Sequence, residues 1–202
     1  MITLPKSSVH VWNVSLDLPV GERDWDILDL SERQRAQRFH REIDRVRFVA
    51  CRSALRRILG TYLGRVPERL SFEYGRHGKP FLEGLQFNVS HADGKSLIAV
   101  NGASPVGVDL EPAARALDVE TLPRIVCSGS ECTKISRLPA ADRPLALLRI
   151  WVGKEAFLKL TGEGLSRPLS QLDVAELPVR FIDAIPGFVS ALALESLSRS
   201  VD

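Results

Sequence analysis

Three short apolar runs follow one another closely in the middle of the chain, and they constrain its fold most strongly. They span Phe87 to Ser90, Ser96 to Asn101 and Val106 to Leu110. The two connecting segments, HADGK and GASP, consist of residues that favour turns. Apolar runs of this length between turn signals are typical of strands. The pattern therefore predicts a small β-sheet.

Helical patterns lie on both sides of this sheet. One begins near Ser31, which can act as its N-cap, and a second begins near Asp44 and runs to about Leu63, before Gly64. A third occupies 140–160, with a proline in its first turn and Gly162 after its end. Further strands are predicted at 9–16, 71–74, 178–183 and 187–194, and a further helix at 119–127.

The order strand, helices, strands occurs twice along the 202 residues, once on each side of about Ser104. This order predicts an α+β fold built from two similar halves, which we place at residues 1–104 and 105–202. A chain of this length suits either one large domain or two small domains that share an interface.

Charge is distributed unevenly along the chain, although the formal net charge is only +2. Arginines are concentrated between Ser31 and Arg57, whereas Asp109 and Glu111 place two acids in an apolar strand. A basic cluster and an acidic pair together suggest an anionic ligand and a metal ion. An arginine-rich stretch is equally typical of a solvated helix face.

The N-terminal sequence lacks the basic region and apolar stretch of a signal peptide, and no run is long enough to span a bilayer. The three cysteines, Cys51, Cys127 and Cys132, have neither a disulfide framework nor metal-ligand spacing. These features predict a cytoplasmic protein with no membrane partner.

The segment VGVDLEP, Val106 to Pro112, carries the first candidate site. Residues two apart on a strand point to the same face, so Asp109 and Glu111 would present adjacent carboxylates. Such carboxylates repel one another unless a cation or a proton lies between them, and oxygen ligands of this kind suit Mg²⁺. An edge strand with two exposed acids would have the same sequence pattern.

The segment RIWVGKEAFLKLTGEGL, Arg149 to Leu165, carries the second candidate site. Glu155 and Lys159 are i,i+4 neighbours on a helix, where they form either a surface pair or part of a site. In a site, Glu155 would add a carboxylate to the metal or act as a base. Lys154 and Lys159 would meet phosphates as point charges.

Two shorter segments complete the set of candidates. In FNVSH, Ser90 precedes His91, but no GxSxG turn surrounds the serine, so a nucleophilic pair is not expected. We predict instead that His91 donates to a phosphate. Arg47 follows the start of the second helix, and Lys79 lies in a Gly–Lys–Pro turn whose backbone can approach a flat ligand.

The order and spacing of these segments are more specific than any one of them. FNVSH, then VGVDLE about twenty residues later, then WVGKEAFLK about forty residues further on, closely resemble the surfactin-type 4′-phosphopantetheinyl transferases. The likeness extends upstream to Arg38, Phe39, Asp44 and Arg47 and to Gly78–Lys79–Pro80, and downstream to GEGLSRPL, Gly162 to Leu169.

The resemblance implies two similar α/β halves in a pseudo-twofold arrangement, with coenzyme A bound in the cleft between them. It implies that Asp109, Glu111 and Glu155 surround Mg²⁺ with the coenzyme A pyrophosphate, and that Asp109, Glu155 and Lys159 are catalytic. The coenzyme A ligands it implies are Arg47 and His91 at the 3′-phosphate, Lys79 and Pro80 with Ser90 on the adenine side, and Lys154 and Lys159 at the other phosphates. Ser128 and Glu131, in CSGSE, resemble a short family motif in which Cys127 replaces an aromatic residue.

In the implied reaction, the serine hydroxyl of an apo acyl or peptidyl carrier protein attacks the β-phosphate of coenzyme A, and 3′,5′-ADP leaves. Mg²⁺ would neutralise developing charge, and lysines would stabilise the leaving phosphate. We hypothesise that Glu155 removes the serine proton, directly or through a water. A single chain that holds both halves also implies a monomer.

The chain departs from the family pattern upstream of Arg38. Ser31 and Gln34 stand where lysine is frequent in the family, and either Arg33 or Arg35 can supply the missing charge.

Three other interpretations compete with this one. A catalytically inert module that binds coenzyme A or a carrier protein would have no need of three metal-binding acids. A nucleic-acid binder would use the arginine-rich helix, but the net charge is near zero and aromatic residues are few. Another Mg²⁺-dependent phosphate enzyme, such as a nucleotide hydrolase, would be expected to carry a P-loop, which the sequence lacks. Which pathway supplies the carrier (fatty-acid, polyketide or nonribosomal-peptide) is left open.

Overall fold

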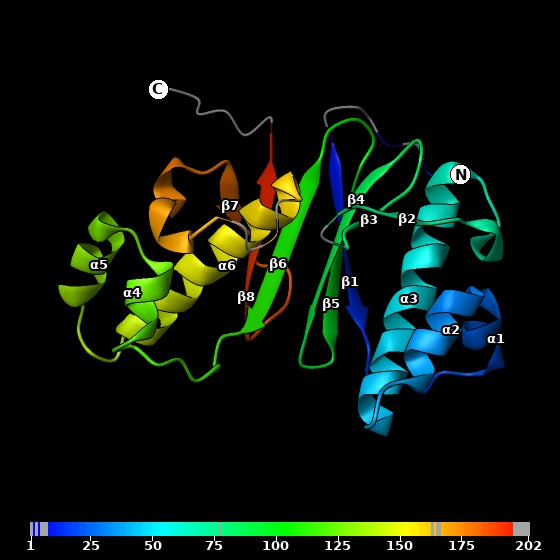
Figure 1. Ribbon diagram of the computed structural model, residues 1–202, viewed down its shortest axis with the longest axis horizontal. Coiled ribbons are helices and arrows are strands. Elements are labelled where there is room, and N and C mark those ends of the chain that lie inside the picture. Colours follow the sequence, from blue (N-terminus) through cyan, green and yellow to red (C-terminus); the bar gives the residue numbers. More distant parts are fainter. Residues whose placement is uncertain are drawn as a thin grey trace.

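The computed structural model describes residues 2, 4, 8–76, 78–162, 164 and 167–195. Two three-stranded antiparallel sheets lie near the middle of the molecule, with helices on both outer sides (Figure 1). The first sheet has the order β1-β5-β4 and comprises β1 (Val9–Ser15), β4 (Gln86–Ala92) and β5 (Lys95–Asn101). The second has the order β6-β8-β7 and comprises β6 (Val106–Pro112), β7 (Val179–Phe181) and β8 (Phe188–Leu194).

The two sheets share one topology. In each sheet, the strand that comes first in the sequence pairs with the second strand of a later hairpin: β1 pairs with β5, and β6 pairs with β8. The turn of the β4–β5 hairpin places Asp93 and Gly94 at positive φ, 43° and 73°, as a tight hairpin turn requires. The expected α+β fold is confirmed, and the repeated topology supports its two similar halves. The boundary near residue 104 stays a prediction.

The helices before the first hairpin are α1 (Glu22–Ile27), α2 (Leu30–Gln37) and α3 (Glu42–Leu63), followed by η1 (Pro67–Arg69), β2 (Glu73–Tyr74) and β3 (Pro80–Phe81). The N-cap of α2 is Asp29, whose side chain accepts from the Glu32 backbone N–H, and not Ser31 as expected. The hydroxyl of Ser31 donates to Asp29 instead. The end of α3 at Gly64, with φ 63°, agrees with the prediction.

The helices after β6 are α4 (Leu122–Val126), α5 (Gly129–Ser136) and α6 (Arg143–Thr161), followed by η3 (Leu169–Gln171) and η4 (Val174–Glu176). Pro144 lies in the first turn of α6, and Gly162, with φ 72°, ends this helix as predicted. The sequence prediction missed α1 and α5. Three residues of the GEGLSRPL segment, Glu163, Leu165 and Ser166, lie outside the described residues.

The hydrophobic core consists of several clusters, one of which joins the two halves. Leu55 and Leu59 of α3 pack against Ile98 and Val100 of the first sheet, and Leu148, Val152 and Ala156 of α6 pack against β8 of the second. Between the sheets, Leu97 and Ala99 share a cluster with Val108, Leu110 and Leu192. The backbone N–H of Val108 also donates to the Asn88 side chain, at 2.9 Å, which joins β6 to β4. A shared apolar cluster and this hydrogen bond therefore join the two sheets.

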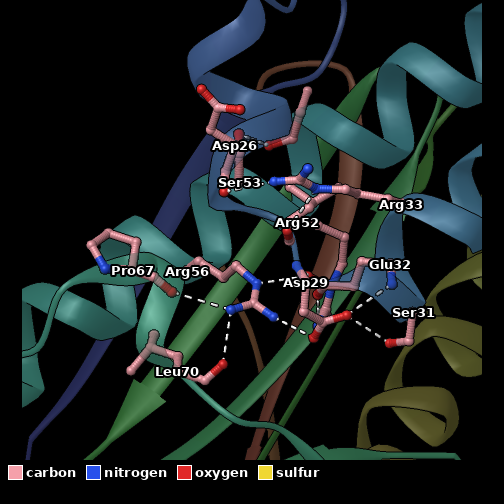
Figure 2. Close-up of polar contacts among 12 residues, drawn as sticks. Asp26, Asp29, Ser31, Glu32, Arg33, Arg52, Ser53, Arg56, Pro67 and Leu70 are labelled. Carbon is pink, nitrogen blue, oxygen red and sulfur yellow. Dashed lines mark hydrogen bonds and ion pairs between the residues drawn. The ribbon is translucent and has the colours of Figure 1, made fainter.

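A buried ion network fastens α2 to α3 (Figure 2). Arg56 of α3 is fully buried, and its guanidinium donates to Glu32 at 2.6 Å, to Asp29 at 2.6 Å and to the backbone carbonyls of Pro67 and Leu70. Arg52 donates to the other oxygen of Glu32. A buried charge is tolerated only when its polar atoms are satisfied in this way.

In the part of the chain that the structure describes, no helix is long and apolar enough to cross a bilayer.

Candidate functional site

Asp109 lies at the meeting point of the two halves. Its carboxylate is 4% exposed, and Oδ1 accepts from the Ser90 hydroxyl at 2.7 Å and from the Lys159 ammonium at 2.6 Å. Lys159 also donates to the Ser90 hydroxyl, at 2.8 Å. Ser90 belongs to β4 of the first sheet, Asp109 to β6 of the second, and Lys159 to α6. The structure thus brings together three of the residues singled out from the sequence.

The second carboxylate oxygen of Asp109 is an unsatisfied acceptor. Oδ2 is buried and has no hydrogen-bond partner among the residues that the structure describes. A buried carboxylate oxygen without a partner is costly, so its presence indicates an interaction with a group supplied from outside the chain. The charge and hardness of the oxygen favour a cation such as Mg²⁺.

Glu155 faces the same region from α6. Burial raises the pKa of its carboxyl above the ordinary value, and the nearby charge of Asp109 raises the pKa further. Glu111 adds a smaller upward effect, whereas the cation of Lys159 opposes all three. A carboxyl whose pKa is raised by neighbouring carboxylates is one whose charged form a metal ion would stabilise.

These carboxylates do not form a closed metal cage by themselves. Within the described residues, no group of three or more histidines, cysteines, aspartates or glutamates is arranged to hold a metal ion. Glu111 is paired with Arg115 instead. Mg²⁺ usually binds through one or two carboxylates, with waters and substrate phosphates as its other ligands. Asp109 and its acidic neighbours therefore fit only the protein's share of a Mg²⁺ site, whose other ligands would come from outside the chain.

Two cavities lie beside Glu155 and Lys159, and they adjoin one another because Pro80 and Val89 line both. The larger, of about 520 Å³, lies between α2, α3 and the β4–β5 hairpin, and the smaller, of about 240 Å³, borders Glu155 and Lys159. Basic and aromatic side chains predominate among the charged and ring-bearing residues of the larger cavity, which two aspartates, Asp44 and Asp93, also line. The basic and aromatic residues include Arg35, Phe39, Arg47, Phe48, Arg52 and His91.

Arg47 and His91, expected at one phosphate, do line the same cavity. Arg47 donates to Asp17 at 2.7 Å, and this hydrogen bond holds the pKa of its guanidinium above the ordinary value. Burial lowers the pKa of His91, and the cations of Lys159 and Arg35 lower it further. An anion that binds beside the fixed cation of Arg47 would therefore stabilise the charged form of the His91 imidazole.

The structure distinguishes between the two arginines that could replace the missing lysines. Arg35 lines the larger cavity, with its guanidinium 5.3 Å from the centre of the Phe48 ring. Arg33 donates instead to the backbone carbonyls of Leu28, at 2.9 Å, and Asp26, at 3.0 Å. Only Arg35 is placed to meet a ligand in this cavity.

Lys79 lines the smaller cavity, but its ammonium is directed at the backbone of the other half. It donates to the carbonyls of Lys159 at 2.5 Å, Leu160 at 3.2 Å and Val106 at 3.4 Å. Burial lowers the pKa of this amine. Lys79 therefore satisfies carbonyls at the end of α6, where a helix leaves them without partners.

Lys154 does not reach either cavity, which corrects the expectation that it contacts a phosphate. Its side chain is fully buried, and its ammonium donates to Glu131 and to the backbone carbonyls of Val126 and Leu169. Glu155 and Lys159 face the site from the same helix. Lys154 lies on the opposite side because consecutive helical residues are rotated by about 100°.

The sequence analysis missed Asp17, which orients Arg47, and Asn88, which ties β6 to β4. Asn88 lies inside the FNVSH segment, so its position was marked although its role was not. No local pattern marks Asp17, because its partner is thirty positions away in the chain.

Comparison with known proteins shows which family the chain resembles. A model of the 4′-phosphopantetheinyl transferase superfamily matches residues 105–193, which include Asp109, Glu111 and Glu155. The chain is 37% identical over 185 residues to the 4′-phosphopantetheinyl transferase HetI of Nostoc sp., covering 88% of this chain and 78% of the relative.

Two relatives from Bacillus are more distant. The 4′-phosphopantetheinyl transferase psf-1 of Bacillus pumilus is 32% identical, covering 71% of this chain and 61% of the relative. The 4′-phosphopantetheinyl transferase Sfp of Bacillus subtilis is 25% identical, covering 82% of this chain and 76% of the relative.

Proposed function

We infer that this chain, which belongs to the 4′-phosphopantetheinyl transferase superfamily, transfers the 4′-phosphopantetheine moiety of coenzyme A to a serine of an apo carrier protein. The transfer releases 3′,5′-ADP. The observation that carries this conclusion from the structure is the Asp109 carboxylate. One of its oxygens is held by Ser90 and Lys159, and the other is buried without a partner beside two cavities.

We propose that the larger cavity takes the nucleotide end of coenzyme A. Arg47, His91 and Arg35 supply the positive charge that suits the 3′-phosphate, while the Phe39 and Phe48 rings suit a flat base. Pro80 belongs to both cavities, so the loop of Lys79 and Pro80 would border the adenine side. The pyrophosphate would then lie in the smaller cavity, beside Lys159.

Asp109, Glu111 and Glu155 are proposed to hold Mg²⁺ together with that pyrophosphate. When bound, the metal ion would polarise the phosphoryl oxygens and neutralise developing negative charge. For Glu111 to take part, its pairing with Arg115 must give way. Both members of that pair are partly exposed, so the ion pair contributes little to stability. Replacing Arg115 by Mg²⁺ at the Glu111 carboxylate would therefore cost little free energy.

The residues of the chain account for the remaining steps. The serine oxygen of the carrier attacks the β-phosphorus, and the bond from this phosphorus to the bridging oxygen breaks. Glu155 is proposed to take the serine proton, directly or through a water, because it lines the smaller cavity where the pyrophosphate is assigned. Lys159 is proposed to stabilise the charge that the leaving 3′,5′-ADP acquires.

We propose that the enzyme is of the surfactin type and acts as a monomer. Two sheets of identical strand order in one chain, with the site between them, support both proposals. The carrier is proposed to be an acyl or a peptidyl carrier protein.

Intact-mass spectrometry tests the reaction directly. An apo carrier protein from each of the three pathways is incubated with the chain, coenzyme A and Mg²⁺. We expect the carrier to gain the mass of one phosphopantetheinyl arm, and we expect EDTA or Asp109→Ala to abolish this gain. Coenzyme A binding without any gain on any carrier would instead support an inert binding module.

A further inference from the structure

The buried ammonium of Lys154 has all three of its N–H donors satisfied. They reach Val126 at 2.7 Å and Leu169 at 3.1 Å through backbone carbonyls, and the Glu131 carboxylate at 2.5 Å. These partners come from the end of α4, from η3 and from α5 respectively. One side chain of α6 therefore holds three separate segments of the second half.

Glu131 extends this clamp to further segments. The oxygen that receives Lys154 also accepts from the backbone N–H of Ser128, at 2.7 Å, and the other oxygen accepts from the backbone N–H of Val174, at 2.8 Å. Glu131 is 2% exposed. We call Lys154 and Glu131 the second-half clamp. It fixes α4, α5, η3 and η4 on one side of α6.

The first half contains an equivalent arrangement, drawn in Figure 2. Glu32 caps α2 as Glu131 caps α5, and the buried Arg56 of α3 binds this glutamate and two backbone carbonyls as Lys154 does. Arg56 stands eight residues before the glycine that ends α3 (64 − 56), and Lys154 stands eight residues before the glycine that ends α6 (162 − 154). We call Arg56 and Glu32 the first-half clamp.

The two clamps support different parts of the site. The first-half clamp fixes α2, which carries Arg35 into the larger cavity. The second-half clamp fixes α4 and α5, which follow Glu111 in the chain and place Ile125, an apolar side chain 65% exposed, on the surface. The larger cavity is lined by first-half residues, whereas Glu155, the proposed base, lines the smaller cavity from α6 of the second half. The carrier serine must therefore reach α6, the helix to which the second-half clamp ties α4 and α5.

Resting on the proposed function, we propose that Lys154 and Glu131 are positioning residues that set α4 and α5 for carrier recognition, with no contact to coenzyme A. Each half would thus use a buried ion pair of the same design to position the surface that meets one of the two substrates. The first-half clamp serves the coenzyme A side, and the second-half clamp serves the carrier side.

Kinetics of Lys154→Met and of the double variant Lys154→Met with Glu131→Gln test this proposal. We expect a carrier KM about tenfold above that of the unaltered enzyme, with the coenzyme A dissociation constant unchanged within about twofold. The double variant leaves no buried unpaired carboxylate, so it can fold even where the single variant does not. Arg65→Met, at an exposed basic residue of the first half outside both clamps and both cavities, is the control and should leave both constants unchanged.

The first-half clamp supplies the reciprocal comparison. Arg56→Met with Glu32→Gln should weaken coenzyme A binding by about tenfold and leave the carrier KM within about twofold. Equal effects of the two double variants on both constants would overturn the proposal, because they would indicate a general loss of structure. A rise in the coenzyme A dissociation constant for Lys154→Met alone would overturn it too, because it would make Lys154 a phosphate ligand.

Amine labelling of the unaltered protein gives a readout that depends on neither activity nor variant folding. An amine-reactive reagent should modify Lys154 much more slowly than Lys134, an exposed lysine of α5, and coenzyme A should not change the rate at Lys154. Protection of Lys154 by coenzyme A would contradict the proposal. If no carrier is modified by the unaltered enzyme, the proposed function fails, while the labelling result still decides whether Lys154 contacts coenzyme A.

Discussion

Single side chains in the site are shared between the two halves of the molecule. Asp109 binds Ser90 of the first half and Lys159 of the second through one oxygen, which leaves its other oxygen for a ligand. Lys159 is therefore held in place before any phosphate arrives. A preorganised cation of this kind stabilises developing charge without a reorganisation cost.

Glu155 is the residue whose proposed role as a base can be tested most directly. Glu155→Gln keeps the size of the side chain and removes its ability to take a proton. We expect kcat to fall by about 10²- to 10⁴-fold, the usual contribution of a general base. Mg²⁺ affinity is measured separately, and Glu120→Gln, at an exposed acid, is the control. If turnover survives while metal binding is intact, Glu155 is not the base.

Arg35 and Arg33 form a natural pair of test and control, because they lie two positions apart on α2 and only Arg35 lines the larger cavity. Arg35→Ala should raise the coenzyme A dissociation constant by about tenfold to a hundredfold, since a hydrogen bond to a charged group contributes about 1.5–3 kcal/mol. Arg33→Ala should leave coenzyme A affinity nearly unchanged. Isothermal titration with coenzyme A and with its 3′-dephospho form measures both effects. A loss of affinity equal for the two ligands would place Arg35 away from the 3′-phosphate.

At the scale of elements, the contact of α6 with β6 decides how the site is assembled. Gly107 lies two residues before Asp109, and a Cβ at this position would lie 2.0 Å from the carbonyl oxygen of Ala156 and 2.4 Å from the backbone nitrogen of Leu160. Only glycine permits helix and strand to approach so closely. The approach lets Lys159 of α6 reach Asp109 of β6 at 2.6 Å.

Gly107→Ala should push α6 away from β6. We expect the free energy of unfolding to fall by about 1–3 kcal/mol, as is usual for overpacking. The kcat should fall by up to about 100-fold if the Asp109–Lys159 contact is displaced by about 1 Å. Urea unfolding and steady-state kinetics measure the two effects. Gly129→Ala is the control, because a Cβ there meets nothing within 4 Å. Equal stabilities of Gly107→Ala and the unaltered protein would refute this account of the contact.

At the scale of the whole molecule, the two halves are joined by a shared core and by a few polar contacts. Lys79 belongs to the first half, and its ammonium binds carbonyl oxygens of β6 and α6 in the second. Asn88 makes a similar link to Val108. These contacts cross from the first half to the second, and both cavities lie beside them. We therefore expect coenzyme A binding to change the stability of the whole chain.

Lys79→Met retains the apolar stem of the side chain and removes its ammonium. The carbonyls at the end of α6 lose their partner, so we expect the free energy of unfolding to fall by about 1–3 kcal/mol. Lys95→Met is the control, because among the described residues the ammonium of Lys95 makes only one hydrogen bond, to Ser15 at 3.4 Å. Chemical denaturation with and without coenzyme A separates the two possible roles. Unchanged stability with a large loss of coenzyme A affinity would make Lys79 a ligand and not a link between halves.

The sequence alone determined the local structure and the chemistry of the candidate residues. Gly64 and Gly162 marked the ends of the two long helices, because a left-handed residue there is a local backbone property. The alternation in VGVDLEP placed Asp109 and Glu111 on one face, because strand geometry has a period of two residues. The positions of α1 and of the α2 N-cap were missed, since short helices carry little periodic signal.

Only the tertiary structure decided which of these residues meet. Asp109 lies nineteen positions from Ser90 and fifty from Lys159, and no local pattern specifies contacts over such separations. Lys154 and Lys159 are two lysines of one helix, yet one is buried in a clamp and the other reaches the site. Periodicity shows which residues of a helix share a face. The packing of α6 against the surrounding strands and short helices decides the rest. It determines which face of α6 is buried in the second half and which face lines the cavity.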